Sequence, residues 1–143
     1  MPEIDKRIIK FINQHHIFTL ATSNNNIPYT STCFYVYLPE ENCFVFTSDY
    51  ETKHVKDMIL QPKVAGAVAL ETNMVGKIRG IQFTGEVKLL ECDELKKAKK
   101  AYINRFPVAL LAKTVFWGFY PDFIKMTDNR LGFGKKIIWN KNE

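Results

Sequence analysis

Two kinds of hydrophobic spacing divide this chain into helical and extended segments. An apolar stripe at helical spacing predicts a first helix over about residues 3–15, and helical spacing recurs at 52–60 and 93–106. Pro107 starts a further short helical piece that we expect to reach about residue 113. Segments that alternate apolar and polar residues, or that are rich in Thr, Tyr, Phe and Val, predict strands at 17–23, 29–38, 43–48, 63–70, 77–91, 121–127 and 135–139.

The order of these elements indicates the fold class. Six to seven strands with regular turns, a helix in front and helices at two crossings are typical of a small, mostly antiparallel β-barrel with α additions. Glycines inside the predicted strands, at Gly66, Gly80 and Gly85, are expected to mark bulges or sharp bends. No linker or repeat interrupts the pattern, so we expect residues 1–143 to form a single domain.

The composition is that of an ordinary soluble globular protein, with 46% apolar and 24% charged residues. No apolar run approaches the roughly 18 residues of a membrane span, and the first residues do not have the pattern of a signal peptide. We therefore expect a cytoplasmic protein with no membrane partner. The three cysteines match no zinc or redox spacing, so we expect free thiols and no metal site.

The formal net charge is +5, and much of it comes from four lysines in the predicted helix at 93–106. Apolar residues recur at helical spacing in this segment, and the lysines fall largely on the other face. That arrangement is typical of a solvated helix surface. No nucleic-acid-binding motif accompanies it, so we expect no nucleic-acid partner.

The segment SDYETKH, residues 48–54, carries a chemical signal where a predicted strand gives way to a predicted helix. It combines two hydroxyls with two basic side chains, which are Ser48, Thr52, Lys53 and His54. Hydroxyls, cations and a helix N-terminus all stabilise a phosphate group. The segment therefore predicts a phosphate site. A plainer interpretation stays open, in which Thr52 only caps the helix and the basic residues are solvated on its first turn.

Several blocks in the same order resemble the FMN-binding split barrel of the pyridoxamine 5'-phosphate oxidase superfamily. The blocks that carry this resemblance over residues 17–91 are TLATSNNNIPYTSTCFY, CFVFTSDYETKHVKDMILQPKVAGAV and IRGIQFTGEVKLLE. The blocks YINRFPVA and KMTDNRLGFGKKIIW, together with IRGIQFTGE, are similar to the small branch of that superfamily typified by the bacterial YhbP protein. The resemblance implies a split β-barrel flanked by helices.

The resemblance also implies a cofactor site at the interface of a homodimer. In flavin-binding relatives a strand-end hydroxyl and a Ser-Arg-Lys run hold the FMN phosphate, and these correspond here to Thr47 or Ser48 and to Thr52, Lys53 and His54. The isoalloxazine ring of FMN would lie against the second strand, at Ser31, Thr32, Cys33 and Phe34. The remaining candidates for cofactor contact are Arg79, Gln82, Lys135 and, across the dimer, Trp117. The plainer interpretation of Trp117 is a core or interface residue, and that of Cys33 is a small buried hydrophobe.

The chain also departs from the vitamin-pathway oxidases of this superfamily. Ser31 stands where they carry Arg, His54 where they carry Lys, and Gly80 where they carry Gln after the arginine. Their C-terminal Arg-x-His-x-Arg motif is absent. We therefore do not expect pyridoxamine phosphate to be the substrate.

The activity that the resemblance implies is that of an FMN-dependent oxidoreductase acting on a small substrate. In such an enzyme the flavin carries the electrons and the protein binds and orients it. No residue stands out as a catalytic acid or base. Three alternatives stay open: a haem-binding protein, a protein that binds another phosphorylated small molecule without chemistry, and a dimeric scaffold.

Overall fold

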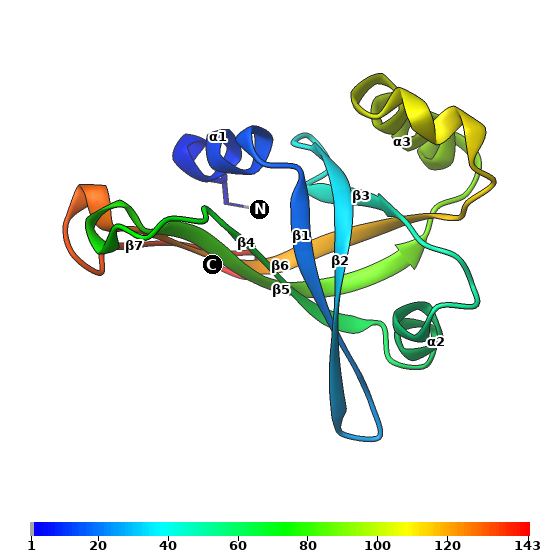
Figure 1. Ribbon diagram of the computed structural model, residues 1–143, viewed down its shortest axis with the longest axis horizontal. Helices are drawn as coiled ribbons and strands as arrows, with labels where there is room; N and C mark the ends of the chain where they lie inside the picture. Colours follow the sequence, from blue (N-terminus) through cyan, green and yellow to red (C-terminus); the bar gives the residue numbers. More distant parts are fainter. Residues whose placement is uncertain (1) are drawn as a thin grey trace.

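The computed structural model describes residues 2–143, whose strands form one antiparallel sheet that closes on itself (Figure 1). In pairing order the strands are β3 (Cys43–Thr47), β2 (Ile27–Leu38), β1 (Ile17–Asn24), β4 (Lys63–Ala69), β5 (Arg79–Leu89), β6 (Phe116–Asp128) and β7 (Lys136–Asn140). A further pairing between β3 and β6 completes the ring, and β7 extends the sheet from β6. The predicted split barrel is confirmed.

Within residues 2–143, three α-helices and three short 3-10 helices accompany the sheet. They are α1 (Lys6–Gln14), α2 (Lys53–Leu60), α3 (Cys92–Arg105), η1 (Val75–Lys77), η2 (Pro107–Leu111) and η3 (Asn129–Leu131). In Figure 1, α2 and α3 lie at the side of the molecule opposite the turn between β6 and β7. Within residues 2–143, no helix has the length and apolar character needed to cross a membrane.

Four phenylalanines from four strands form the centre of the barrel. Phe18 of β1, Phe44 of β3, Phe83 of β5 and Phe119 of β6 are all at most 1% exposed. The rings of Phe44 and Phe83 stack with centroids 4.4 Å apart, and Phe119 meets Phe83 edge-on at 5.0 Å. Because these strands are far apart in the sequence, this cluster fixes how the barrel closes.

The structure corrects one predicted boundary. We expected the strand over 121–127, but β6 begins at Phe116. Phe116, Trp117 and Phe119 are all buried, because this part of β6 faces the barrel core on one side and α3 on the other. A strand that is buried on both faces does not alternate apolar and polar residues, so its pattern was missed.

Different structural features explain the glycines within the strands. The ladder between β5 and β6 shifts register between Thr84 and Gly85, which confirms the predicted bulge at Gly85. A Cβ atom there would lie 2.1 Å from the carbonyl oxygen of Tyr120. Gly66 and Gly80 lie in regular ladders, so neither marks a bulge, and a sharp bend at these positions stays a prediction. At Gly66 a Cβ atom would collide with the Phe83 ring, which explains the glycine by packing.

Candidate functional site

One edge of β2 is free beside the start of α2. β2 pairs with β1 along residues 27–34, but it pairs with β3 only over Tyr35–Leu38. No described strand pairs with the other edge of residues 28–34. β3 ends at Thr47, and the chain then turns away to enter α2 at Lys53. The backbone groups of this β2 edge are therefore available to hydrogen-bond a flat ligand, as the predicted flavin ring requires.

A compact polar cluster lies between this edge and α2. The Oγ atom of Ser48 is 2.6 Å from Nε2 of His54. The thiol of Cys33 lies beside the hydroxyls of Ser31 and Ser48. The Oγ atom of Ser31 is buried and forms no regular hydrogen bond among residues 2–143, since the nearby Cys33 thiol is only a weak partner. A buried polar atom without a partner is rare and costly in proteins, so it is a candidate contact for a ligand.

The loop that carries this cluster is anchored from both sides. The indole Nε1 of Trp117 donates a hydrogen bond to the carbonyl oxygen of Ser48 at 2.9 Å, and the amide of Ser48 donates to the carbonyl of Val115 at 3.0 Å. Trp117 itself is 4% exposed, which places it in the core. The Oγ1 atom of Thr52 accepts a hydrogen bond from the amide of Val55, so Thr52 is the N-cap of α2.

Lys53 is held in place by a buried carboxylate one helical turn away. Its Nζ lies 2.9 Å and 3.2 Å from the two carboxylate oxygens of Asp57, and 4.8 Å from the centre of the Tyr29 ring. The hydroxyl of Thr22 also donates to Asp57, at 3.2 Å. The Asp57 side chain is 3% exposed, whereas that of Lys53 is 50% exposed. Asp57 therefore holds the Lys53 ammonium in place, while half of the Lys53 side-chain surface is open to solvent at the start of α2.

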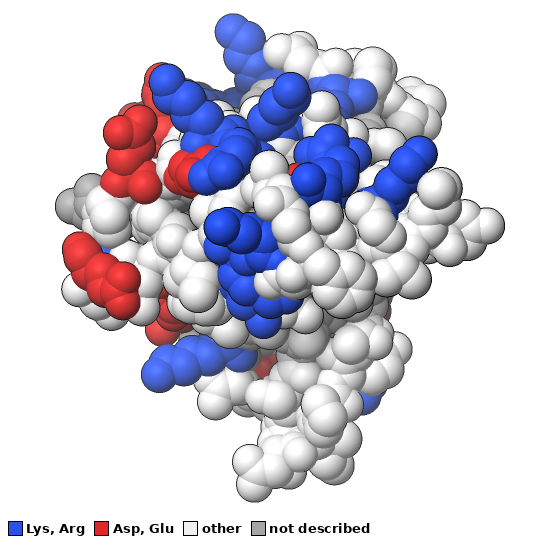
Figure 2. Space-filling view, turned by 90° about the vertical axis from the view of Figure 1, so that its left-hand side faces the viewer, with Lys and Arg blue, Asp and Glu red and all other residues white. Residues whose placement is uncertain are grey.

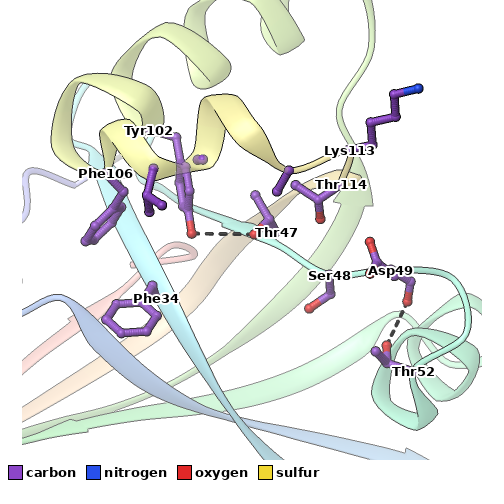
Figure 3. A pocket seen from close by; sticks show the side chains of 12 residues that line it. Phe34, Thr47, Ser48, Asp49, Thr52, Tyr102, Phe106, Lys113 and Thr114 are labelled. Carbon is purple, nitrogen blue, oxygen red and sulfur yellow. Dashed lines mark hydrogen bonds between the residues drawn. The ribbon is translucent and has the colours of Figure 1, made fainter.

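A cavity of about 590 Å³ runs beneath α3 and η2 (Figure 3), and Ser48 and Thr52 line it. Lys53 and His54 directly follow Thr52 but are not among its lining residues. One end is aromatic and includes Phe34, Tyr102 and Phe106, with the Phe34 and Phe106 rings 5.5 Å apart. The other end carries hydroxyl and charged groups and includes Thr47, Ser48, Asp49, Thr52 and Lys113. The volume lies within the range of small-molecule sites, which are mostly apolar with a few convergent polar groups.

Burial sets the protonation of the polar cluster. It lowers the pKa of His54 below the ordinary 6.5, against the opposing influence of the nearby Asp57 carboxylate. The neutral imidazole is therefore the main form at pH 7. Burial also raises the pKa of the Cys33 thiol to about 11, although the hydroxyls of Ser31 and Ser48 oppose this shift. Cys33 is thus a protonated thiol and a poor nucleophile at neutral pH.

The structure brings most of the predicted site residues together. Those around the β2 edge, the cavity and the start of α2 are Ser31, Cys33, Thr47, Ser48, Thr52, Lys53, His54 and Trp117. Thr32 is on β2 as well, but it is exposed and alternates with the buried Cys33. Their contact with a cofactor stays a prediction.

Three predicted residues lie elsewhere within one copy of the chain. Arg79, at the start of β5, packs over the ring of Phe11 of α1, with 5.8 Å between them. Gln82 is exposed on the outer face of β5 and lines a separate hollow. Lys135 lies just before β7. None of the three borders the cavity.

The sequence analysis missed two residues of the site. Asp57 and Thr22 form the buried end of the Lys53 network. The spacing of Lys53 and Asp57, four residues apart in a predicted helix, was a signal that could have revealed the pair. No comparable signal pointed to Thr22, which meets Asp57 only through the packing of α2 on β1. Within residues 2–143, no group of acidic, His and Cys side chains could hold a metal ion.

Comparison with known proteins identifies the family. The family model described as pyridoxamine 5'-phosphate oxidase matches residues 4–120. This chain belongs to the pyridoxamine 5'-phosphate oxidase family. Within it, the UPF0306 protein of Photorhabdus laumondii is 40% identical over 134 residues, which cover 94% of each chain.

Solved structures of this fold include proteins with different named cofactors. A heme binding protein from Mycobacterium smegmatis matches with a TM-score of 0.75 and 17% identity, covering 89% of this chain and 53% of that one. A FAD-binding protein from Mesorhizobium loti matches with a TM-score of 0.72 and 14% identity, covering 86% and 93%. At these identities the likeness establishes the fold alone.

Proposed function

We propose that this member of the pyridoxamine 5'-phosphate oxidase family binds FMN in the cavity beneath α3 and η2. The observation that carries the proposal is the polarity of the cavity. Its end beside α2 offers hydroxyls and a helix N-terminus, while its other end is lined by aromatic rings along a free strand edge. An FMN molecule has the same two parts, a phosphate and a flat apolar ring with hydrogen-bonding edges.

The phosphate would lie at the start of α2. The first amides of a helix have no partner within it, and here the Val55 amide is already bonded to Thr52. The amides of Lys53 and His54 therefore remain for the phosphate oxygens. The Ser48 hydroxyl would donate to the phosphate while accepting from Nε2 of His54, and the Lys53 ammonium would use a proton that is not bonded to Asp57. A helix N-terminus favours an anion through its dipole as well.

The ring would lie against the free edge of β2 and reach Phe34 and Phe106. The buried Ser31 hydroxyl, which has only the weak Cys33 thiol beside it within residues 2–143, would gain a stronger partner there. FMN would supply electron transfer, and the protein's residues would bind and orient it. This supports a flavin-dependent oxidoreductase whose small substrate enters from the open side of the cavity.

The rim of the cavity supports a homodimer. Phe34 and Val108, which line the cavity, expose 52% and 72% of their surface. Exposed apolar side chains grouped in this way often mark an interface. A second copy related by two-fold symmetry, the commonest arrangement, would cover this rim and shield the ring from water. Light scattering at micromolar concentration tests this, and a monomer would refute it.

The cofactor is tested by the absorption spectrum of freshly purified protein and by calorimetric titration with FMN, riboflavin and haem. We expect a flavin spectrum and tighter binding of FMN than of riboflavin. A Soret band and tight haem binding would instead assign the haem alternative, which the M. smegmatis neighbour makes the main rival. A colourless protein that gives no heat with FMN would refute the proposal.

A pair of serine variants locates the phosphate. Ser48→Ala should weaken FMN binding by about 10- to 100-fold, since a hydrogen bond to a charged group contributes about 1.5–3 kcal/mol. Ser23→Ala is the matched control, because Ser23 lies on β1 and does not border the cavity. Equal effects of the two variants would remove Ser48 from the site.

A further inference from the structure

The end of the barrel away from α2 and α3 carries two loops that are tied into one unit. Asn129, the first residue of η3, donates from Nδ2 to the carbonyl of Val75 in η1 at 2.9 Å. Its backbone amide donates to the carbonyl of Ile78 at 3.0 Å, and its Oδ1 accepts from the amide of Gly134 at 3.0 Å. One asparagine therefore holds η1, η3 and the turn before β7 together. We call this unit, residues 74–78 and 129–136, the loop tip.

The loop tip presents large apolar side chains to solvent. Met74, Val75 and Leu131 are 52%, 58% and 43% exposed, and Phe133 is 83% exposed. Phe133 stands between Gly132 and Gly134, both of which have positive φ angles (140° and 73°). Because the two neighbours have no side chain, the Phe133 ring is the most prominent group at this turn.

Basic side chains surround these apolar groups. Lys77, Lys135 and Lys136 are exposed, and none of them forms an ion pair with another residue in 2–143. Arg130 is also at this end, but its charge is paired with the buried Asp128. Figure 2 views the molecule from this side and shows Lys and Arg side chains gathered over the face, with acidic groups mainly toward one margin.

From this combination we propose that the loop tip docks on an anionic phospholipid surface. Apolar side chains that insert among lipids, surrounded by lysines that meet anionic headgroups, give reversible binding without any membrane-spanning segment. If the partner were another protein with a flat surface, we would expect the apolar side chains of the loop tip to lie level with the residues around them. Here the most exposed group is a single ring on a glycine-flanked turn. The site is separate from the FMN cavity and does not depend on it.

Vesicle co-sedimentation tests the proposal with the chain of residues 1–143. We expect binding to vesicles that contain phosphatidylglycerol, little binding to pure phosphatidylcholine, and weakening as salt rises. The double variant Lys135→Gln/Lys136→Gln should weaken binding by about 25-fold, from about fivefold for each lysine at the surface. Phe133→Ser should weaken it by at least about tenfold, since the inserted ring is lost.

Matched controls separate the loop tip from general surface effects. Lys99→Gln/Lys100→Gln on α3 removes the same charge, and Leu60→Ser on α2 removes a side chain that is 72% exposed. Both controls should bind vesicles like the wild type. Equal weakening by control and loop-tip variants, or no binding to anionic vesicles, would overturn the proposal. So would a Phe133→Ser variant that binds vesicles normally but shifts the oligomeric state in light scattering, because a second copy of the chain would then be the occupant.

Discussion

Replacing Lys53 tests the placement of the phosphate most directly. Its ammonium is 2.9 Å from Asp57, and half of its side chain faces solvent at the start of α2. A charge-assisted hydrogen bond contributes about 1.5–3 kcal/mol, or about 10- to 100-fold in affinity. Solvent screens a half-exposed group, so we expect Lys53→Ala to weaken FMN binding by about tenfold, at the lower end of this range. Riboflavin, which has no phosphate, should bind as before.

The control for this experiment must account for Asp57. Removing Lys53 alone leaves a buried carboxylate with only the Thr22 hydroxyl as partner, which is destabilising. The double variant Lys53→Met/Asp57→Asn removes both charges and so avoids the unpaired one. Titration calorimetry of both variants with both ligands should give the same selective loss for FMN. A parallel loss of FMN and riboflavin would show that Lys53 acts through the fold, and unchanged FMN binding would refute the phosphate placement.

Three further predictions follow from the same contacts. Because a bound phosphate favours the imidazolium form, the contribution of His54 to FMN affinity should be greatest below the free-protein pKa and fall as pH rises through that of the complex. His54→Lys should remove this dependence between pH 6 and 8.5, and identical titrations of the two proteins would refute it. Hydrogen bonding from Lys53 lowers the pKa of Asp57, so its stabilisation is present above about pH 4 and lost as pH falls through the folded pKa. Urea unfolding of Asp57→Asn should therefore show a flatter acid limb than the wild type, and an unchanged limb would contradict this. Gly85→Ala should lower the free energy of unfolding by about 1–3 kcal/mol or more, while Gly76→Ala, whose Cβ would meet nothing within 4 Å, should change it by less than about 0.5 kcal/mol. Equal urea midpoints for the two glycine variants would refute that reasoning.

Local sequence patterns were enough to predict most of the barrel. β5 has one face in the core, so its residues alternate and reveal the strand, whereas β2 is revealed by its richness in Thr, Tyr, Phe and Val. The start of β6 escaped because the chain packs on both of its sides. Its burial depends on α3, whose position on the sheet no local pattern specifies.

The candidate site likewise combines contacts that the local sequence predicts with contacts that only the packing of distant elements creates. Ser48 and His54 are six residues apart, and the cap at Thr52 fixes where the helix that carries His54 begins. Their contact could therefore be predicted from the local sequence. Trp117 reaches Ser48 from 69 residues away, through the pairing of β3 with β6. Arg79 and Lys135 were predicted from residue type and block order alone. Neither feature specifies on which end of the barrel a side chain lies.

The charges around the start of α2 explain why the protonation of His54 should have a large effect on phosphate binding. Lys53 is already balanced by Asp57, and the buried imidazole of His54 is mainly neutral at pH 7, so in their main form these three side chains carry no net charge. Without a protonated His54, an FMN phosphate there would depend on the Lys53 ammonium, the amides of α2 and hydroxyls. Protonating His54 would raise the local charge from zero to one, a larger relative change than at a site with two free lysines. The phosphate's own second ionisation, near pH 6, opposes this in acid. The net pH dependence therefore has a maximum between the two titrations, and the histidine sets only its alkaline side.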